Sequence, residues 1–187
     1  MADDTKLRAA SLADVQRICE IDTDASSKFA SIVELADLAD GSHGPLEPQR
    51  VRDWLEDGDV YVLETSSTTV GFTACQTRDD IVYIAELSVC AAHQGRGHGG
   101  RLLGAVFEQA AKIALDSGSA IARVSLTTFA DVEWNGPFYR KRGFQEVSPD
   151  SLGPWHVQKA LNDDKDLARP GYRRCTMLRE WKATAGA

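Results

Sequence analysis

Four glycines lie within six consecutive residues, at Gly95, Gly97, Gly99 and Gly100. An apolar stretch, Ile81–Val89, comes just before them, and a helical pattern starts directly after them. Glycine adopts positive φ at low cost, so this run permits a very tight turn. A strand that leaves such a turn as a helix points several backbone N–H groups toward the positive helix end. The sequence therefore predicts an anion-binding turn, suited to a pyrophosphate, over residues 94–101.

The segments around this turn predict one mixed α/β domain over residues 1–187. Alternate residues of 81–89 share a face, which is typical of a strand, whereas Leu102, Val106, Ala110 and Ile113 recur at helical spacing. Further strands are predicted over 60–64, 69–76, 121–126, 144–147 and 173–180. Further helices are predicted over 11–21, 31–38, 50–55 and 134–141. Loops are predicted over 41–48 and 148–172, and a turn is predicted at Ser66 and Ser67.

Other phosphate-binding motifs fit the turn less well. The nucleotide-triphosphate loop requires Lys and Ser or Thr where this chain has Arg101 and Leu102, so that motif is excluded. The dinucleotide fingerprint matches the glycine spacing, but it requires an acid near the end of the next strand, which here ends in Thr127 and Thr128. A connection that binds no ligand is the structural alternative, although four glycines make a plain connector costly in chain entropy.

Two motifs resemble the signatures of the GCN5-related N-acetyltransferases. Gln94-x-x-Gly97-x-Gly99, directly after Leu87-x-Val89, resembles the acetyl-CoA motif of that family. Residues 135–144, Asn-Gly-Pro-Phe-Tyr-Arg-Lys-Arg-Gly-Phe, resemble its second signature, a Phe-Tyr followed after three residues by Gly-Phe. The two motifs occur in the family's order, and the resemblance covers roughly residues 60–144.

The resemblance implies a fold and a co-substrate. The fold is an α/β (α+β) domain with a mixed, mostly antiparallel central sheet flanked by helices, and the co-substrate is acetyl-CoA. The pantetheine arm would lie beside the strand, and the pyrophosphate on the glycine-rich turn. The residues implied at the cofactor are Leu87, Ser88, Val89, Gln94, Gly95, Arg96, Gly97, His98, Gly99, Gly100 and Asn135. Many relatives carry the Asn earlier, where this chain has Asp131 and Val132, so Asn135 departs from the common pattern.

Two residues are predicted to carry the chemistry. In this family the amine attacks the thioester directly, so a general base and a general acid suffice. Tyr139 occupies the Tyr of the Phe-Tyr pair and is the predicted acid, with a packed core tyrosine as the alternative. Glu86 interrupts an apolar strand face and is the predicted base, or a group that binds a cationic amine. An ion pair with a nearby Arg is the alternative for Glu86.

The acceptor is predicted to be a small-molecule amine, such as a metabolite or an antibiotic. A protein lysine or N-terminus remains a second class, and a CoA-binding sensor without turnover a third. The pocket is expected from the first two helices and from residues 41–48 and 148–172. Its candidate lining residues are Trp54, Trp134, Trp155 and His156. A homodimer is compatible with the resemblance.

The composition of the chain limits the classes of partner, metal and compartment that we expect for it. A net charge of -7 disfavours non-specific nucleic-acid binding and is compatible with a cationic substrate. The four cysteines and four histidines show no metal-ligand spacing, so reduced thiols and no structural metal are expected. The absence of a long apolar run and the acidic N-terminus predict a cytoplasmic protein without a membrane segment.

Overall fold

The computed structural model describes residues 5–39 and 44–184, which divide by their internal contacts into two compact units. The first unit lies within residues 1–76 and 84–105, and the second within residues 77–83 and 106–187. Strand β4 (Ile81–Val89) and helix α3 (His98–Asp116) each contribute to both units.

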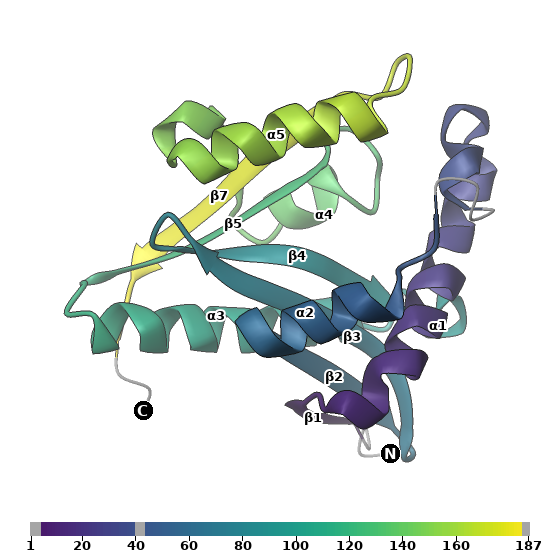
Figure 1. The fold of residues 1–187 in the computed structure, drawn as a ribbon, viewed down its shortest axis with the longest axis horizontal. Coiled ribbons are helices and arrows are strands. Elements are labelled where there is room, and N and C mark those ends of the chain that lie inside the picture. Colours follow the sequence, from purple (N-terminus) through teal and green to yellow (C-terminus); the bar gives the residue numbers. More distant parts are fainter. Residues whose placement is uncertain (1–4, 40–43, 185–187) are drawn as a thin grey trace. The chain divides into compact units, whose positions relative to one another are not determined.

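The strands of the first unit form an antiparallel arrangement. β1 (Thr5–Ala9) pairs with β2 (Asp59–Thr65), which pairs with β3 (Thr68–Arg78), and β3 neighbours β4 (Figure 1). Ser66 and Ser67 have φ of 49° and 64°, the conformation that a two-residue hairpin turn requires. The predicted strands and this turn are confirmed. β1 was not predicted, although Leu7 and Ala9 alternate with polar residues.

The helices of the first unit follow the predicted pattern with one exception. α1 (Val15–Ser26) and α2 (Pro48–Asp57) confirm the first and third predicted helices. The predicted helix over 31–38 is wrong, because this segment forms 3₁₀ turns over Ser27–Ser31 and Val33–Leu38. Leu35 is the buried residue of these turns, so little packing is available to stabilise a full α-helix. Residues 41–43 of the predicted loop lie outside the described residues, whereas 44–47 are loop.

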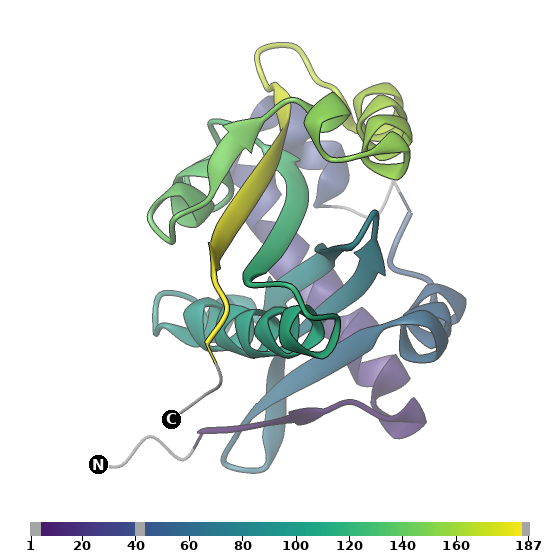
Figure 2. The ribbon, with the colours of Figure 1, turned by 90° about the vertical axis from the view of Figure 1, so that its left-hand side faces the viewer.

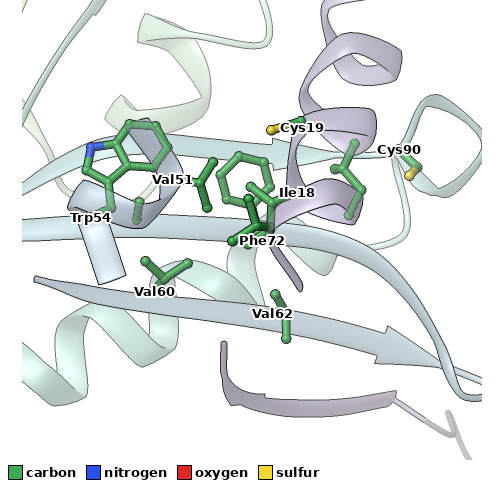
Figure 3. Packing of buried hydrophobic residues seen from close by; sticks show 11 residues of the cluster. Ile18, Cys19, Val51, Trp54, Val60, Val62, Phe72 and Cys90 are labelled. Carbon is green, nitrogen blue, oxygen red and sulfur yellow. The ribbon is translucent and has the colours of Figure 1, made fainter. Parts of the chain in front are cut away.

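Two layers of apolar packing build the first unit. Val62 and Leu63 are neighbours on β2, so their side chains point to opposite faces of the strand. Val62 joins the cluster that contains Ile18 of α1, Trp54 of α2 and Phe72 of β3 (Figure 3). Leu63 packs instead with Val89 and with Leu102 of α3. Each such fully buried side chain contributes roughly 1.5–3 kcal/mol, so helices are held on both strand faces.

The second unit contains the remaining strands. β5 (Ile121–Phe129) pairs antiparallel with β7 (Arg174–Lys182), which pairs antiparallel with β6 (Gln145–Val147) (Figure 2). Val82 and Tyr83 of β4 pair in parallel with Val124 and Ser125 of β5. The sheet is therefore mixed and mostly antiparallel, and the predicted fold class is confirmed.

A long helix corrects the prediction for residues 148–172. This segment was expected to be mostly loop, but it contains α5 (Pro154–Leu167). Pro154 begins the helix, where its missing N–H has no consequence. The first backbone N–H groups donate to Asp79 Oδ2, with distances of 3.1 Å from Trp155 N and 3.2 Å from His156 N. The group that caps this helix comes from the turn before β4, far away in sequence.

Candidate functional site

The glycine-rich turn is open on the side where a ligand would approach. Gly95 and Gly97 have φ of +73° and +85°, and a Cβ at either position would meet nothing within 4 Å. The backbone amides of Gly95, Gly97 and Gly99 make no backbone hydrogen bond within the described residues. Helix α3 begins immediately afterwards at His98, so its positive end faces the same turn. These features fit a bound pyrophosphate.

Side chains brace the turn from within the first unit. Gln94 Nε2 donates to the carbonyl of Val89 at 2.9 Å, and Ala91 N donates to Asp24 Oδ2 at 2.7 Å. The Arg101 guanidinium donates to the carbonyl of Thr5 at 3.0 Å. The predicted cofactor residue Gln94 therefore uses its side chain to shape the turn, which leaves the backbone to meet a ligand.

The other predicted residues of the turn differ in exposure. Arg96 is exposed, so its guanidinium is accessible to an anion. His98 is buried, with its ring 6.1 Å from that of His93, so its backbone is the part suited to a ligand. Gly100 N donates to Gly97 O at 3.0 Å and is thereby engaged in the first turn of α3.

The end of β4 carries the predicted base. Glu86 is half-buried, and its Oε1 accepts a hydrogen bond from Leu87 N at 3.0 Å. Thr73 Oγ1 donates to the Glu86 carbonyl at 2.9 Å, which fixes the backbone of this strand. Because Leu87 N and the carbonyl of Val89 both have partners inside the protein, a pantetheine arm would have to share or displace these bonds.

A second carboxylate, which the sequence analysis did not single out, lies beside Glu86. Ser88 Oγ is 3.3 Å from Asp22 Oδ1 of α1 and 3.3 Å from Glu86 Oε1. Burial, and then the charge of Glu86, raise the pKa of Asp22 to about 7. We call Asp22, Ser88 and Glu86 the paired-acid cluster. A sequence signal was present, since Asp22 lies three and four residues after the buried Cys19 and Ile18 of α1.

The second signature folds in the second unit. Tyr139 is buried in α4 (Gly136–Arg140), with its ring 5.5 Å from that of Phe144. Gly143, with φ of 84°, turns the chain back, and Phe144 N donates to Tyr139 O at 3.2 Å. The spacing between the Phe-Tyr and Gly-Phe pairs is therefore the length needed for a helical turn, a stop and a return. The predicted helix and its glycine stop are confirmed.

Asn135 immediately precedes α4. Its backbone N donates to Val132 O at 2.9 Å, and its carbonyl accepts from Tyr139 N at 3.1 Å. A Cβ on the next residue, Gly136, would lie 2.0 Å from Ala130 O, so only glycine fits there. The Asn-Gly-Pro sequence is thus explained by the backbone, while contact between Asn135 and the cofactor stays a prediction.

The second unit contains another polar cluster, which we call the capping cluster: half-buried Asp79 with the buried His156 and Ser125. His156 Nδ1 lies 2.9 Å from Asp79 Oδ2, and Ser125 Oγ lies 2.8 Å from His156 Nε2. Ser125 is 0% and His156 1% exposed, so His156 cannot line a substrate site as was predicted. The hydrogen bond from His156 is the largest cause of the lowered pKa of Asp79. Despite its resemblance to a hydrolase triad, the buried serine cannot reach a substrate.

A pocket of about 590 Å³ lies within the second unit. It includes part of the segment 148–172 that was predicted to contribute to substrate binding, and Asp163 on its wall pairs with Lys159 and Arg174. Its lining residues are Thr127, Glu146, Val147, Ser148, Pro149, Ala160, Asp163, Asp164, Arg174, Cys175 and Thr176. Trp54, another predicted lining residue, belongs instead to the core of the first unit.

The described residues offer neither a metal-ligand cluster nor a membrane-spanning helix, and their cysteines are reduced. Across residues 5–39 and 44–184, no group of three or more His, Cys, Asp or Glu could hold a metal ion. In the same ranges, none of the helices has the length and apolar character to cross a bilayer. All four cysteines are free and buried, and burial raises the pKa of Cys75 to about 12 and of Cys175 to about 11.

Comparison with known proteins identifies the family. Residues 56–146 match the family model described as an acetyltransferase (GNAT) domain. Similar solved structures include the PaiA N-acetyltransferase of Thermoplasma acidophilum with coenzyme A, at a TM-score of 0.64 and 14% identity, covering 95% of this chain and 99% of that one. The ribosomal-protein-S18-alanine N-acetyltransferase of Escherichia coli is similar at a TM-score of 0.65 and 15% sequence identity. This match covers 97% of this chain and 96% of that one.

A third similar structure is much longer than this chain. The N-acetylglutamate synthase of Neisseria gonorrhoeae, complexed with coenzyme A and N-acetyl-glutamate, gives a TM-score of 0.65 at 19% identity. The match covers 97% of this chain but 35% of the synthase. At these identities the three structures establish a shared fold.

Proposed function

Because this chain belongs to the GNAT acetyltransferases, we propose that it transfers the acetyl group of acetyl-CoA to the primary amine of a small molecule. The glycine-rich turn carries the proposal, since its open positive-φ glycines at the start of α3 suit a pyrophosphate. The net charge of -7 and the carboxylates of Asp22 and Glu86 suit a cationic acceptor.

The residues divide the reaction between a base and an acid. The amine nitrogen forms a bond to the thioester carbonyl carbon as the carbon–sulfur bond breaks. Glu86 accepts the proton that the nitrogen loses, and Tyr139 donates a proton to the departing thiolate. Each transfer contributes roughly 100- to 10,000-fold to the rate. No covalent intermediate on the protein is needed.

The first experiment measures free-thiol release from acetyl-CoA with a panel of small amines and peptides, alongside calorimetry of acetyl-CoA binding. We expect binding of acetyl-CoA and release that depends on a small amine. Release with peptides alone would move the acceptor to the protein class. Binding without release across the panel would favour a sensor, and a failure to bind acetyl-CoA would overturn the proposal.

Gly97→Ala tests the phosphate-binding turn. The new methyl group would stand where the backbone must approach the pyrophosphate, so we expect the Kd for acetyl-CoA to rise at least about 10-fold. Gly118→Ala is the matched control, since Gly118 also has positive φ, +74°, and open space around it. Both variants should lose about 1–2 kcal/mol of folding stability from backbone strain. Equal weakening of acetyl-CoA binding in both would contradict the assignment of the turn.

Tyr139→Phe tests the acid. The ring packing against Phe144 is retained, so we expect unchanged acetyl-CoA affinity and a kcat lower by roughly 10- to 100-fold. Tyr172→Phe, in the same unit and half-buried, serves as the control. Steady-state thiol release measures both variants, and unchanged turnover in Tyr139→Phe would remove Tyr139 from the acid role.

A further inference from the structure

The position of Asp22 on α1 is unusual for a carboxylate. Residues three and four positions apart share a helix face, so Asp22 lies on the stripe that carries Ile18 and Cys19. Both of those side chains are buried in the core of the first unit. A charged group on this stripe is costly unless it has a partner or a role. Asp22 is half-buried, and the hydroxyl of Ser88 is its hydrogen-bond partner among the described side chains.

The geometry of the paired-acid cluster leaves its two acids competing for one hydrogen. The Ser88 hydroxyl has a single hydrogen and lies 3.3 Å from an oxygen of each carboxylate. Glu86 also accepts a hydrogen bond from Leu87 N, which stabilises its charged form, whereas Asp22 accepts from the Ser88 hydroxyl. With both acids charged, one of them lacks the hydroxyl hydrogen. One retained proton removes this conflict and the repulsion between the two charges.

We propose that Asp22 is a positioning residue that shares one proton with Glu86 through the Ser88 hydroxyl, and so sets the pH at which Glu86 accepts a proton from the amine. This inference rests on the proposed acetyl transfer and adds to it the residue that tunes its base. Two interacting acids titrate as a pair, so the acidic limb of the pH profile belongs to the cluster and to neither carboxylate alone. The raised pKa of Asp22 supports this reading. A base that titrates near neutral pH is the most effective one at that pH.

The charged groups around the cluster favour the same arrangement. Glu86 on β4 is the charged group that acts on Asp22, and its charge raises the pKa of that carboxyl. On α1 itself, Asp22 in turn helps to raise the pKa of the Cys19 thiol, after burial. Among the charged groups of the adjoining elements, Glu47 and Arg52 act on Cys19, and Arg17 and Asp24 act on Cys90.

The test compares Asp22→Asn with the wild type in the pH dependence of kcat/KM. Removing the second carboxyl removes the repulsion between the two charges, so we expect the acidic limb to move down by at least about one pH unit. The maximal kcat should fall about 10-fold because the base becomes weaker. Glu20→Gln removes an exposed charge from the same helix and should leave the limb in place. A limb that stays in place in Asp22→Asn would overturn the proposal.

A second readout is independent of turnover. The folded protein holds the Asp22 proton up to about pH 7, whereas an ordinary Asp loses it near 3.8. The stability from this proton is therefore complete at low pH and is lost as the pH rises toward 7. We expect the Tm of the wild type to fall between about pH 4 and pH 7, and that of Asp22→Asn to fall less. If the Tm of the wild type and that of Asp22→Asn changed with pH in parallel, the shared proton would be overturned, even with no amine acceptor identified. A difference in Tm without acetyl transfer would retain the shared proton and reject the proposed function.

Discussion

The paired-acid cluster and the capping cluster are built from similar parts, and they meet the same problem of buried charge in opposite ways. In the capping cluster, Asp79 accepts from the backbone and side chain of His156, and the other nitrogen of His156 meets Ser125. Every neighbour complements the next one, and the pKa of Asp79 is lowered. In the paired-acid cluster a serine stands between two like charges, and the pKa of Asp22 is raised.

This contrast separates a structural role from a functional one. Complementary neighbours stabilise the fold, which explains why the capping cluster sits at the start of α5, with Ser125 and His156 closed to solvent. Like charges destabilise the fold, so their retention at the end of β4 suggests a reaction that needs a proton acceptor near neutral pH. Substitutions in the paired-acid cluster should change activity, and those in the capping cluster should change stability.

Glu86→Gln should have the largest effect. Gln retains the shape of the side chain but cannot accept a proton at neutral pH, so we expect kcat/KM to fall roughly 100- to 10,000-fold. The affinity for acetyl-CoA, measured by calorimetry, should stay within about threefold because the glycine-rich turn is untouched. A matched change outside the cluster, Glu180→Gln, removes an exposed acid and should leave turnover unchanged. Full activity in Glu86→Gln would reduce the paired-acid cluster to a structural feature.

His156→Ala should have the next largest effect, and the quantity that it changes is the stability of the fold. The change removes the imidazole that contacts both Ser125 and Asp79 and opens a cavity at a side chain that is 1% exposed. We expect the free energy of unfolding to fall by about 2–4 kcal/mol. Urea denaturation at pH 7 measures it, with the exposed Gln158→Ala on the same helix as the control. A loss no larger than that of the control would show that the capping cluster does not stabilise the second unit.

Asp79→Asn should have a smaller effect that depends on pH. The folded state lowers the pKa of Asp79, so its contribution is present above the ordinary value of 3.8 and is lost as the pH falls through the folded value. Asn can still accept hydrogen bonds from the helix start, and we expect a loss of about 1 kcal/mol at pH 7. The stability difference from the wild type should shrink below pH 4, the reverse of the trend expected for Asp22→Asn. Urea denaturation at pH 3 and pH 7 measures the free energy of unfolding of the wild type and of Asp79→Asn. A difference between the two proteins that is larger at pH 3 than at pH 7 would contradict the pairing of Asp79 with His156.

Local patterns were sufficient for much of the fold. The bounds of β4 were predicted as they are observed, because its alternation is long and the turns on both sides are clear. Gly143 and the Ser66–Ser67 turn were also predicted, since positive φ leaves a local signal. The glycine-rich turn was recognisable for the same reason: the backbone itself requires glycine there.

Features that depend on distant partners were not predicted. The sequence of 148–172 looked like loop because the cap of α5 comes from Asp79, and β1 depends on its pairing with β2. His156 was a candidate to line the substrate pocket, whereas packing places it in the core beside Ser125.

The sequence by itself determined the strands from β2 to β5, the glycine-rich turn and the two family signatures. Those features are encoded in residues close together along the chain, where glycine conformation and side-chain periodicity act directly. Only the tertiary structure decided which polar residues meet. It brings Asp22 of α1 to Ser88 of β4, 66 residues away, and the pKa of a carboxyl depends on neighbours within a few ångströms, whatever their distance in sequence.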